Sequence, residues 1–444
     1  MKLKIYCILS TIAFLLSGCN NSFLPTNKDS EINIPSTFVS SSENSDEINS
    51  SEINESEEDK KYDYLKFEAH ADGYYVVAGF AKEKKEEVLI PDYYKGQPVK
   101  IIKKDAFYSA RNLMKLTLGN NIEEIGDAAF YNTGIEEITF PNSLQIISNQ
   151  AFSTCRNLKE IKFSDNVFNI NSGAFSYCSS LESVDLPENL SSLSDSAFSY
   201  CTSLKNIVLP ENLSSLGKYA FSHCTSLESV VLPKNLSSLG DWAFSDCVNL
   251  KTISLPENLL SMGGSVFLGC TSLESVVIND NLEKLLGSTF TECVSLKSIV
   301  FGKKIKSVGW ETFKGCTSLK EIEIPEHIYD FEAHTFNSCT SLEKVNFLSN
   351  ELSEYMFYNC ISLTSITFSD NLQIIAKRSF ENCVSLKEIV LPKSIEYIGE
   401  DSFKGCTSLT KIYFEGTEEQ WNAIDIHEAN EDLFSKEIVF NYSK

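Results

Sequence analysis

Cysteine and histidine are the residue types in this chain whose chemistry could build a reactive or metal-binding site. The sequence holds 14 Cys and 5 His. Twelve of the Cys, from Cys155 to Cys406, each follow a Phe by three residues, and the other two are Cys7 and Cys19. A nucleophile or a metal site needs groups that converge on one pocket. A strictly periodic set is spread along the chain instead, which indicates a structural column.

The position of the periodic Cys accepts other small side chains. Ala110 and Thr133 occupy it in the first two units, which is what a packing position allows. An even number of Cys in an exported protein would suggest disulfides. Stacked parallel units, however, hold neighbouring Cβ atoms about 4.8 Å apart, beyond the roughly 3.5 to 4.5 Å of a bridge. The pattern therefore favours buried free thiols, with disulfides as the alternative.

The histidines and carboxylates give no sign of catalysis. No His stands at metal-ligand spacing from Asp, Glu or Cys, and the acidic residues are distributed along the repeats, whereas acid–base chemistry needs convergence. We therefore predict that the chain is not an enzyme and has no cofactor or metal site. The five histidines are His70, His223, His327, His334 and His427.

The charge balance excludes a nucleic-acid binder. The chain has 444 residues, 61 Asp plus Glu against 38 Lys plus Arg, and a formal charge of −23. A phosphate-binding surface needs a basic stripe. Length alone would suggest several globular domains, but internal repetition overturns that expectation.

The first residues form a targeting signal. Lys2 and Lys4 precede an apolar run at 8–16, which is too short to span a bilayer. The next residues complete the sequence LSGC at 16–19, which resembles the lipobox of bacterial lipoproteins. We therefore expect a signal peptide over 1–18 and lipid modification of Cys19, which would anchor the protein to a membrane. The alternative is a plain signal peptide with a chance Cys.

Residues 19–60 have the composition of a tether. The segment is rich in Ser and acidic residues and poor in large apolar ones. Such a chain cannot bury enough surface to offset its lost entropy. We predict a disordered, solvated spacer that holds the folded part away from the membrane.

A repeat of about 23 residues dominates the rest of the chain. Eleven of the thirteen steps between successive repeat Phe residues are 23 residues long, and the others are 22 and 21. A fixed period of this length predicts a solenoid. The repeat Phe residues are Phe107, Phe130, Phe152, Phe175, Phe198, Phe221, Phe244, Phe267, Phe290, Phe313, Phe336, Phe357, Phe380 and Phe403.

One unit can be read as one coil. Ile207 and Leu209 are two residues apart, which is the period of a strand, and Pro210 ends the strand because it has no N–H. The Asn column that includes Asn212 suits the corner that follows. From 213 to 221 the apolar spacing predicts a short helical or irregular segment. Each coil must stack on its neighbours to bury its apolar residues.

These residues resemble the BspA-like leucine-rich repeat family of bacterial and protozoan surface proteins. The segment 187–224, PENLSSLSDSAFSYCTSLKNIVLPENLSSLGKYAFSHC, follows that family's pattern. The resemblance implies a leucine-rich repeat solenoid with a parallel β-sheet on the concave face, short helical or irregular convex segments, and about 13 to 14 repeats. It also implies an N-terminal β cap at 61–105, repeats at 106–414 and a C-terminal cap at 415–444.

The outward-facing strand residues are the candidate contact surface. Side chains alternate along a strand, so the residue between the two inward ones points outward. Its central members form a stripe of mostly apolar residues, which is either a contact zone for a protein or an effect of the β-propensity of Val. These candidate ligand-contact residues are Val208, Val231, Ser254, Val277 and Val300.

A second column alternates in charge. We interpret it first as a device that fixes the register of near-identical coils, with partner recognition as a secondary role. Its members are Lys159, Glu182, Lys205, Glu228, Lys251, Glu274 and Lys297, followed by Lys320 and Glu343.

Two functions remain open. Members of the resembled family are implicated in adhesion to host matrix proteins and to other bacteria. This implies a cell-surface lipoprotein, anchored through Cys19, that binds host or bacterial surface glycoproteins through its sheet. The alternative is a structural or self-associating component of the cell envelope without a host ligand.

Overall fold

The computed structural model describes residues 57–443. The predicted signal peptide at 1–18, Cys19 and most of the predicted tether lie outside these residues. The last four residues of the tether segment form the short helix α1 (Glu57–Lys60). In this helix Asp59 is buried, and its carboxylate accepts a hydrogen bond from the backbone N–H of Lys95 at 2.9 Å. The folded unit therefore begins slightly before the predicted boundary at residue 61.

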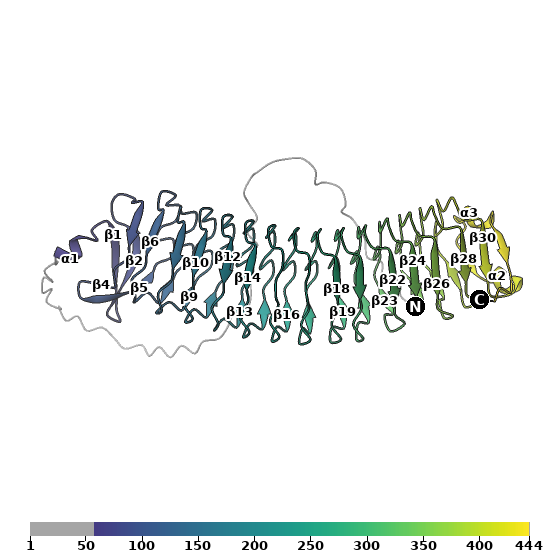
Figure 1. Ribbon diagram of the computed structural model, residues 1–444, viewed down its shortest axis with the longest axis horizontal. Coiled ribbons are helices and arrows are strands. Elements are labelled where there is room, and N and C mark those ends of the chain that lie inside the picture. The colour runs from purple at the N-terminus through teal and green to yellow at the C-terminus, as the bar shows by residue number, and fades with distance from the viewer. Residues whose placement is uncertain (1–56, 444) are drawn as a thin grey trace, which may run out of the picture. The chain divides into compact units, whose positions relative to one another are not determined.

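The described residues form a solenoid with two columns of mostly parallel strands (Figure 1). The first column holds the longer strands, of three or four residues each. They are β3 (Glu87–Leu89), β6 (Lys115–Thr117), β8 (Glu137–Thr139), β10 (Glu160–Lys162), β12 (Ser183–Asp185), β14 (Asn206–Val208), β18 (Ser275–Val277), β20 (Ser298–Val300), β22 (Glu321–Ile324), β24 (Lys344–Phe347), β26 (Ser365–Phe368), β28 (Glu388–Leu391), β30 (Lys411–Phe414) and β32 (Glu437–Val439).

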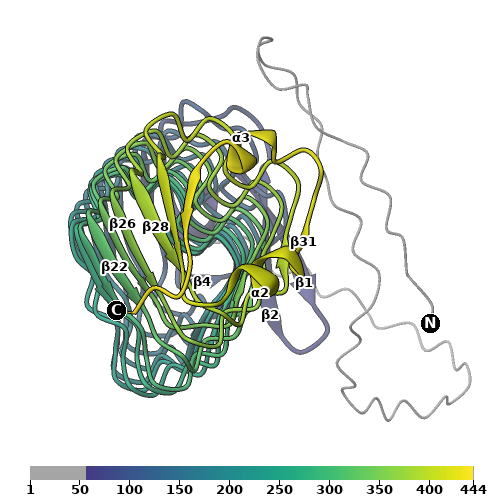
Figure 2. The same cartoon turned by 90° about the vertical axis from the view of Figure 1, so that its right-hand side faces the viewer.

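The second column holds strands of only two residues, and Figure 2 shows its member β31 on the opposite side of the coil from β22, β26 and β28. Its strands are β7 (Glu124–Ile125), β9 (Ile146–Ile147), β11 (Asn169–Ile170), β13 (Ser192–Leu193), β15 (Ser215–Leu216), β16 (Ser238–Leu239), β17 (Ser261–Met262), β19 (Lys284–Leu285), β21 (Ser307–Val308), β23 (Asp330–Phe331), β25 (Glu351–Leu352), β27 (Ile374–Ile375), β29 (Tyr397–Ile398) and β31 (Asp425–Ile426).

The pairing register equals the sequence period. Leu216 in β15 lies opposite Leu193 on one side and Leu239 on the other, each 23 residues away. Val208 in β14 lies opposite Asp185 in β12. Every position in the unit therefore becomes a row that runs along the stack, as the repeat predicted.

The leucine-rich repeat solenoid is confirmed, and the segment from Leu213 to Phe221 takes the irregular form of the two that we expected. It holds β15 and then a series of turns. Two residues that flank Phe221 have positive φ, Tyr219 at 55° and His223 at 60°. Because L-residues enter this left-handed region singly and not in helices, the chain cannot form a helix here.

The repeat Phe residues form the centre of the core. The ring of Phe221 stacks between those of Phe198 and Phe244, with centroid distances of 5.9 and 5.5 Å and nearly parallel planes. These side chains are fully buried. The backbone N–H of Phe221 donates to the carbonyl oxygen of Ala243 in the next coil. Each coil is thus held by its neighbours through both ring stacking and backbone hydrogen bonds.

Both ends of the described chain depart from the repeat. At the N-terminal end, β1 (Leu65–His70) pairs antiparallel with β2 (Tyr74–Phe80), which pairs in parallel with β5 (Gln97–Ile102). The short β4 (Tyr93–Tyr94) also pairs with β5.

At the C-terminal end are two short helices, α2 (Glu418–Asn422) and α3 (Glu431–Phe434). Thr417 and Gln420 form a capping box on α2, and Trp421 within this helix is buried. None of the helices within residues 57–443 is long or apolar enough to span a membrane.

The Phe column yields a prediction about stability. Replacing Phe221 by Ala should lower the free energy of unfolding by about 3 to 5 kcal/mol, because it leaves a cavity that the rings on either side cannot fill. The loss should spread to adjacent coils. Urea unfolding gives the magnitude, and amide hydrogen exchange gives its extent. Lys234→Ala, at an exposed corner, is the matched control. Faster exchange confined to the coil of Phe221 would contradict mutual support between coils.

Candidate functional site

The five predicted contact residues lie in one row on the face of the longer strands; we call Val208, Val231, Ser254, Val277 and Val300 the valine row. Its four Val side chains are between 56% and 82% exposed. The inward neighbours of Val208, Val231 and Val277 are buried, with Val230 only 6% exposed beside Val231 at 82%, and Ile299 beside Val300 is partly buried. Strand alternation therefore sets their direction, as the sequence predicted.

The valine row is continuous from coil to coil. Val277 lies directly opposite Val300 across the β18–β20 pair. In the two coils that lack a full strand, parallel bridges join Ser229 to Thr252 and Thr252 to Ser275, and these keep the same register. The apolar side chains are thus presented at the spacing of parallel strands, about 4.8 Å per coil.

Beside the valine row runs a row of small uncharged residues that the sequence analysis did not single out. Five of them lie two residues before a member of the valine row, the sixth holds the same place in the coil before Val208, and all are exposed. Because their side chains are short and uncharged, few atoms and no charges project from this part of the face. We call them the serine row: Ser183, Asn206, Ser229, Thr252, Ser275 and Ser298.

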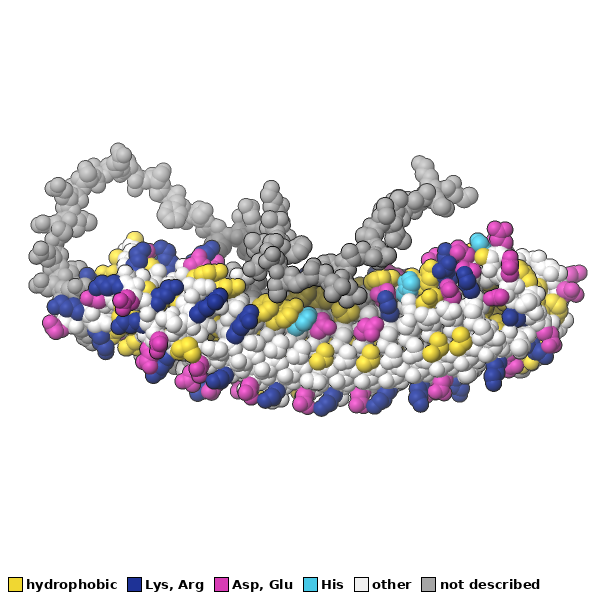
Figure 3. All heavy atoms as spheres, turned by 90° about the horizontal axis from the view of Figure 1, so that it is seen from above, with side chains coloured by type: hydrophobic (Ala, Val, Ile, Leu, Met, Phe, Trp, Pro, Cys, Tyr) yellow, Lys and Arg dark blue, Asp and Glu magenta, His cyan; other side chains and the backbone are white. Residues whose placement is uncertain are grey.

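The alternating charges form a third row on this face, and Glu136 extends it by one coil. We call Glu136, Lys159, Glu182, Lys205, Glu228, Lys251, Glu274 and Lys297 the charge row. Figure 3 shows Lys and acidic side chains alternating along one margin of the solenoid, with separate apolar side chains next to them.

The charges pair two by two along the chain. Each Lys contacts the Glu of the preceding coil, at 3.2 Å for Lys159 and Glu136, 3.1 Å for Lys205 and Glu182, and 2.9 Å for the other two pairs. The hydrogen bond from Lys251 lowers the pKa of Glu228, and that from Lys297 lowers the pKa of Glu274. The attraction expected between neighbouring coils therefore forms at every second step.

The outward-facing residues become polar after Val300. The next outward residues are Glu323, Asn346 and Thr367, which help to line a shallow hollow of about 570 Å³. The Thr367 hydroxyl donates to the Asn346 side-chain oxygen at 2.8 Å. The apolar part of the face is therefore bounded by polar groups at this end.

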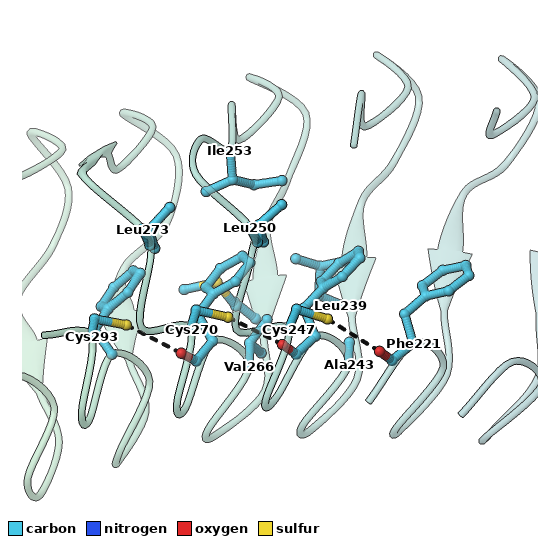
Figure 4. Packing of buried hydrophobic residues seen from close by; sticks show 14 of the residues in the cluster. Phe221, Leu239, Ala243, Cys247, Leu250, Ile253, Val266, Cys270, Leu273 and Cys293 are labelled. Carbon is cyan, nitrogen blue, oxygen red and sulfur yellow. Dashed lines mark hydrogen bonds between the residues drawn. The ribbon is translucent and has the colours of Figure 1, made fainter. Parts of the chain in front are cut away.

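The twelve repeat Cys are buried free thiols, as the packing argument favoured. Each sulfur donates a hydrogen bond to the carbonyl oxygen of a Phe in the preceding coil (Figure 4). Cys247 donates to Phe221, and Cys270 donates to Phe244, at 3.2 Å in both cases. Burial raises the pKa of these thiols, to about 12 for Cys201. They are held in the protonated form, which is the form that can donate.

His223 belongs to a row of stacked side chains. Its ring stacks on Tyr200 at 4.2 Å, and Tyr200 stacks on Tyr177 at 4.4 Å. The Nε2 atom lies 3.5 Å from a carboxylate oxygen of Asp246 in the next coil. The sequence contains the signal, because all four residues stand just before a repeat Cys and therefore share one row.

The Asn side chains form hydrogen bonds between neighbouring coils, and not only within the corner that the sequence analysis assigned to them. The side-chain amide of Asn212 donates to the carbonyl oxygen of Glu188 at 3.0 Å, and that of Asn235 donates to Glu211 at 2.9 Å. Each acceptor lies 24 residues earlier, in the preceding coil. Across residues 57–443, no group of three or more His, Cys, Asp or Glu side chains is arranged to hold a metal ion.

Comparison with known proteins identifies the repeat. The family model described as "BspA type leucine rich repeat region" matches residues 80–205, 192–320 and 306–424. No curated protein matches the chain.

Solved structures share the fold. A leucine-rich repeat protein from Bacteroides ovatus is 24% identical, with a TM-score of 0.55 over 85% of this chain and 98% of its own. A leucine rich cell surface protein from Faecalibacterium prausnitzii is 25% identical, with a TM-score of 0.48 over 82% and 96%. The pneumococcal vaccine antigen PcpA is 21% identical, with a TM-score of 0.43 over 81% and 80%.

The buried thiols predict a loss of stability at high pH. Their pKa in the folded state lies above the ordinary value of 9.0. The contribution of the buried thiols to the free energy of unfolding is therefore fully present below pH 9. It is lost as the pH rises toward the pKa of the folded state, which is about 12 for Cys201. Each thiol contributes a slope of up to about 1.4 kcal/mol per pH unit above pH 9. Urea unfolding followed by circular dichroism at pH 7.5 and pH 10 measures the fall.

The control for this prediction replaces Cys201, Cys224 and Cys247 by Ala, the residue that stands at the same place in the first coil. The triple variant should lose less stability between the two pH values than the parent does. An equal fall in both proteins would assign the effect to Lys and Tyr residues and contradict the role of the thiols.

Proposed function

The chain belongs to the BspA-type leucine-rich repeat family, and from this premise we propose that it is an adhesin-like binding protein at the cell surface. Its partner would be a host matrix or bacterial surface glycoprotein, held on the face of the longer strands. The observation that carries the proposal is the valine row, whose four Val side chains are more than half exposed. Leucine-rich repeat proteins are typically binding scaffolds with extended contact surfaces.

The arrangement of the face suits a protein partner. Exposed apolar side chains in a contiguous row, rimmed by polar and charged ones, are typical of protein contact sites. Here the serine row and, beyond it, the charge row lie along one side of the valine row. The area is extended and shallow, so it suits a broad macromolecular surface better than a small molecule, which needs a concave pocket.

The proposal is of a binding protein and assigns neither catalysis nor a cofactor. The titratable groups of the repeats are arranged in rows along the solenoid, whereas acid–base work requires them to meet at one point. The thiols, which are the most reactive groups by type, are protonated and buried. This chemistry supports a scaffold whose function lies in its surface.

Anchoring at a membrane is part of the same proposal. It is supported by the residues LSGC at 16–19, which follow an apolar run of signal-peptide length. A lipid on Cys19 and the Ser-rich segment after it would place the solenoid beyond the membrane surface. Two acyl chains would be needed for stable attachment.

The valine row can be tested by substitution. Changing Val208, Val231, Val277 and Val300 together to Arg should abolish capture of matrix glycoproteins in a solid-phase assay, because four charges would have to be desolvated in the contact. The corner variant Glu188→Arg, Glu211→Arg and Glu257→Arg changes the net charge by more and leaves this face intact. Capture retained by the first variant would reject the face as the binding site. Capture by neither the wild type nor the variants would favour the envelope component.

Surface location can be tested on whole cells. Protease added to intact cells should release fragments of residues 57–443, because the proposal places the solenoid outside the envelope. Cys19→Ser should move the protein from the membrane fraction into the medium or the periplasm. Protection from protease in intact cells, with cleavage only after lysis, would exclude an adhesin.

A further inference from the structure

The charge row has a symmetry that binding to an unrelated protein does not require. It alternates without a break over eight coils, from Glu136 to Lys297, and the following member is Lys320. Within the chain, ion pairs form only within successive couples, such as Glu228 with Lys251. An alternating row is complementary to its own reverse about any two-fold axis that passes midway between two neighbouring coils, since every Lys then lies opposite a Glu.

We propose that this face binds the same face of a second copy of the chain, with the two solenoids antiparallel. The two-fold axis runs parallel to the strands, between the coil of Glu228 and the coil of Lys251. Each charge then meets its opposite in the second copy. The pairs across the interface are Glu228 with Lys251, Lys205 with Glu274, and Glu182 with Lys297.

The other two rows fit the same axis over the four central coils. In the valine row, Val208 meets Val277 and Val231 meets Ser254, whereas in the outermost coils Val300 meets the exposed Asp185. In the serine row, Ser229 meets Thr252, and both are small. Sheets pack face to face about 10 Å apart, a gap that a Lys from one copy and a Glu from the other can span. The apolar contacts and the charge pairs can therefore form together.

The sequence also limits how far the interface extends. One coil beyond the six that pair, Lys159 would meet Lys320 of the second copy, and the like charges would repel. Six coils at about 4.8 Å give a length of about 29 Å. With a width of about 15 Å, each copy buries about 400 Å², half of what a standard interface buries. The dimer is therefore weak and forms at high local concentration.

This inference goes beyond the binding of a glycoprotein and constrains it. Both partners would occupy the valine row, so a solenoid that is paired with a copy cannot hold a glycoprotein there. Capture should fall as the fraction of dimer rises. The two proposals can still fail separately, because the charge row can be altered while every Val is kept.

The sharpest test exchanges the charges. A variant in which all eight members of the charge row are swapped, Glu for Lys and Lys for Glu, keeps the alternation and the net charge, so it keeps the ion pairs within the chain. It should pair with itself as the wild type does. Mixed pairs of wild type and swapped chain would place like charges opposite each other at all six coils, and they should form at least tenfold more weakly.

Sedimentation velocity of fluorescently labelled wild-type full chain measures the fraction of that chain in dimers. Unlabelled wild type, added up to about 1 mM, should shift the labelled chain toward the dimer, and unlabelled swapped chain should not. An equal shift with both would overturn the charge-matched interface. A labelled chain that stays monomeric throughout the titration would overturn self-association and leave the face to another partner.

The orientation can be tested independently with full chains in which Cys7 and Cys19 are Ser. A short bismaleimide should join chains with Val208→Cys to chains carrying Val277→Cys, because the axis places these two residues opposite each other across the gap of about 10 Å between the sheets, which is too wide for a direct disulfide. Two Val208→Cys chains would hold their thiols three coils apart, about 14 Å. The parent without an added Cys reports any reaction of the buried thiols. Cross-linking of a single variant with itself, as fast as in the mixture, would reject the antiparallel arrangement.

Discussion

No coil of this protein can bury its own side chains, and every other feature depends on that constraint. Phe221 is buried because the rings of Phe198 and Phe244 cover its two faces, and the carbonyl oxygen of Phe221 accepts from the thiol of Cys247 in the next coil. The inward residues must therefore repeat almost without change, since any one of them is part of its neighbours' environment. The outward residues have no such restriction, and their rows are where function can differ between family members.

The rows that face the core and the valine row that faces away from it were both predictable from the sequence, because packing enforces the repeat period and strand alternation fixes which side chains point outward. The Phe, Cys and valine rows each follow from one period and from strand alternation, and the structure places them as expected. Other features depend on single backbone angles or on a choice between equal neighbours. The left-handed φ of Tyr219 and His223 leaves little trace in residue type, because Tyr, His, Asp and Gly all occur at such positions. Likewise Lys251 could have reached Glu274 instead of Glu228, and only coordinates distinguish the two.

The thiol column shows how one position can be restricted by hydrogen bonding as well as by volume. A thiol is small and apolar enough for the core, yet its proton reaches the Phe carbonyl of the preceding coil at 3.2 Å for Cys247. A disulfide or a thiolate would remove that donor and leave a buried carbonyl with one partner fewer. Burial protects the donor by raising the thiol pKa. Free thiols are thus part of the packing scheme.

Pairing within the chain does not prevent the charge row from acting between chains. Each Lys contacts one carboxylate oxygen of its Glu, Oε2 in all four pairs, while a carboxylate has two oxygens and an ammonium group has three donors. Half-exposed charges add little affinity, but they select register and orientation and disfavour wrong pairings. The valine row would supply the buried apolar area, and apolar burial does not by itself select the orientation of the two chains. The two roles are thus divided between the charge row and the valine row, with the uncharged serine row lying between them.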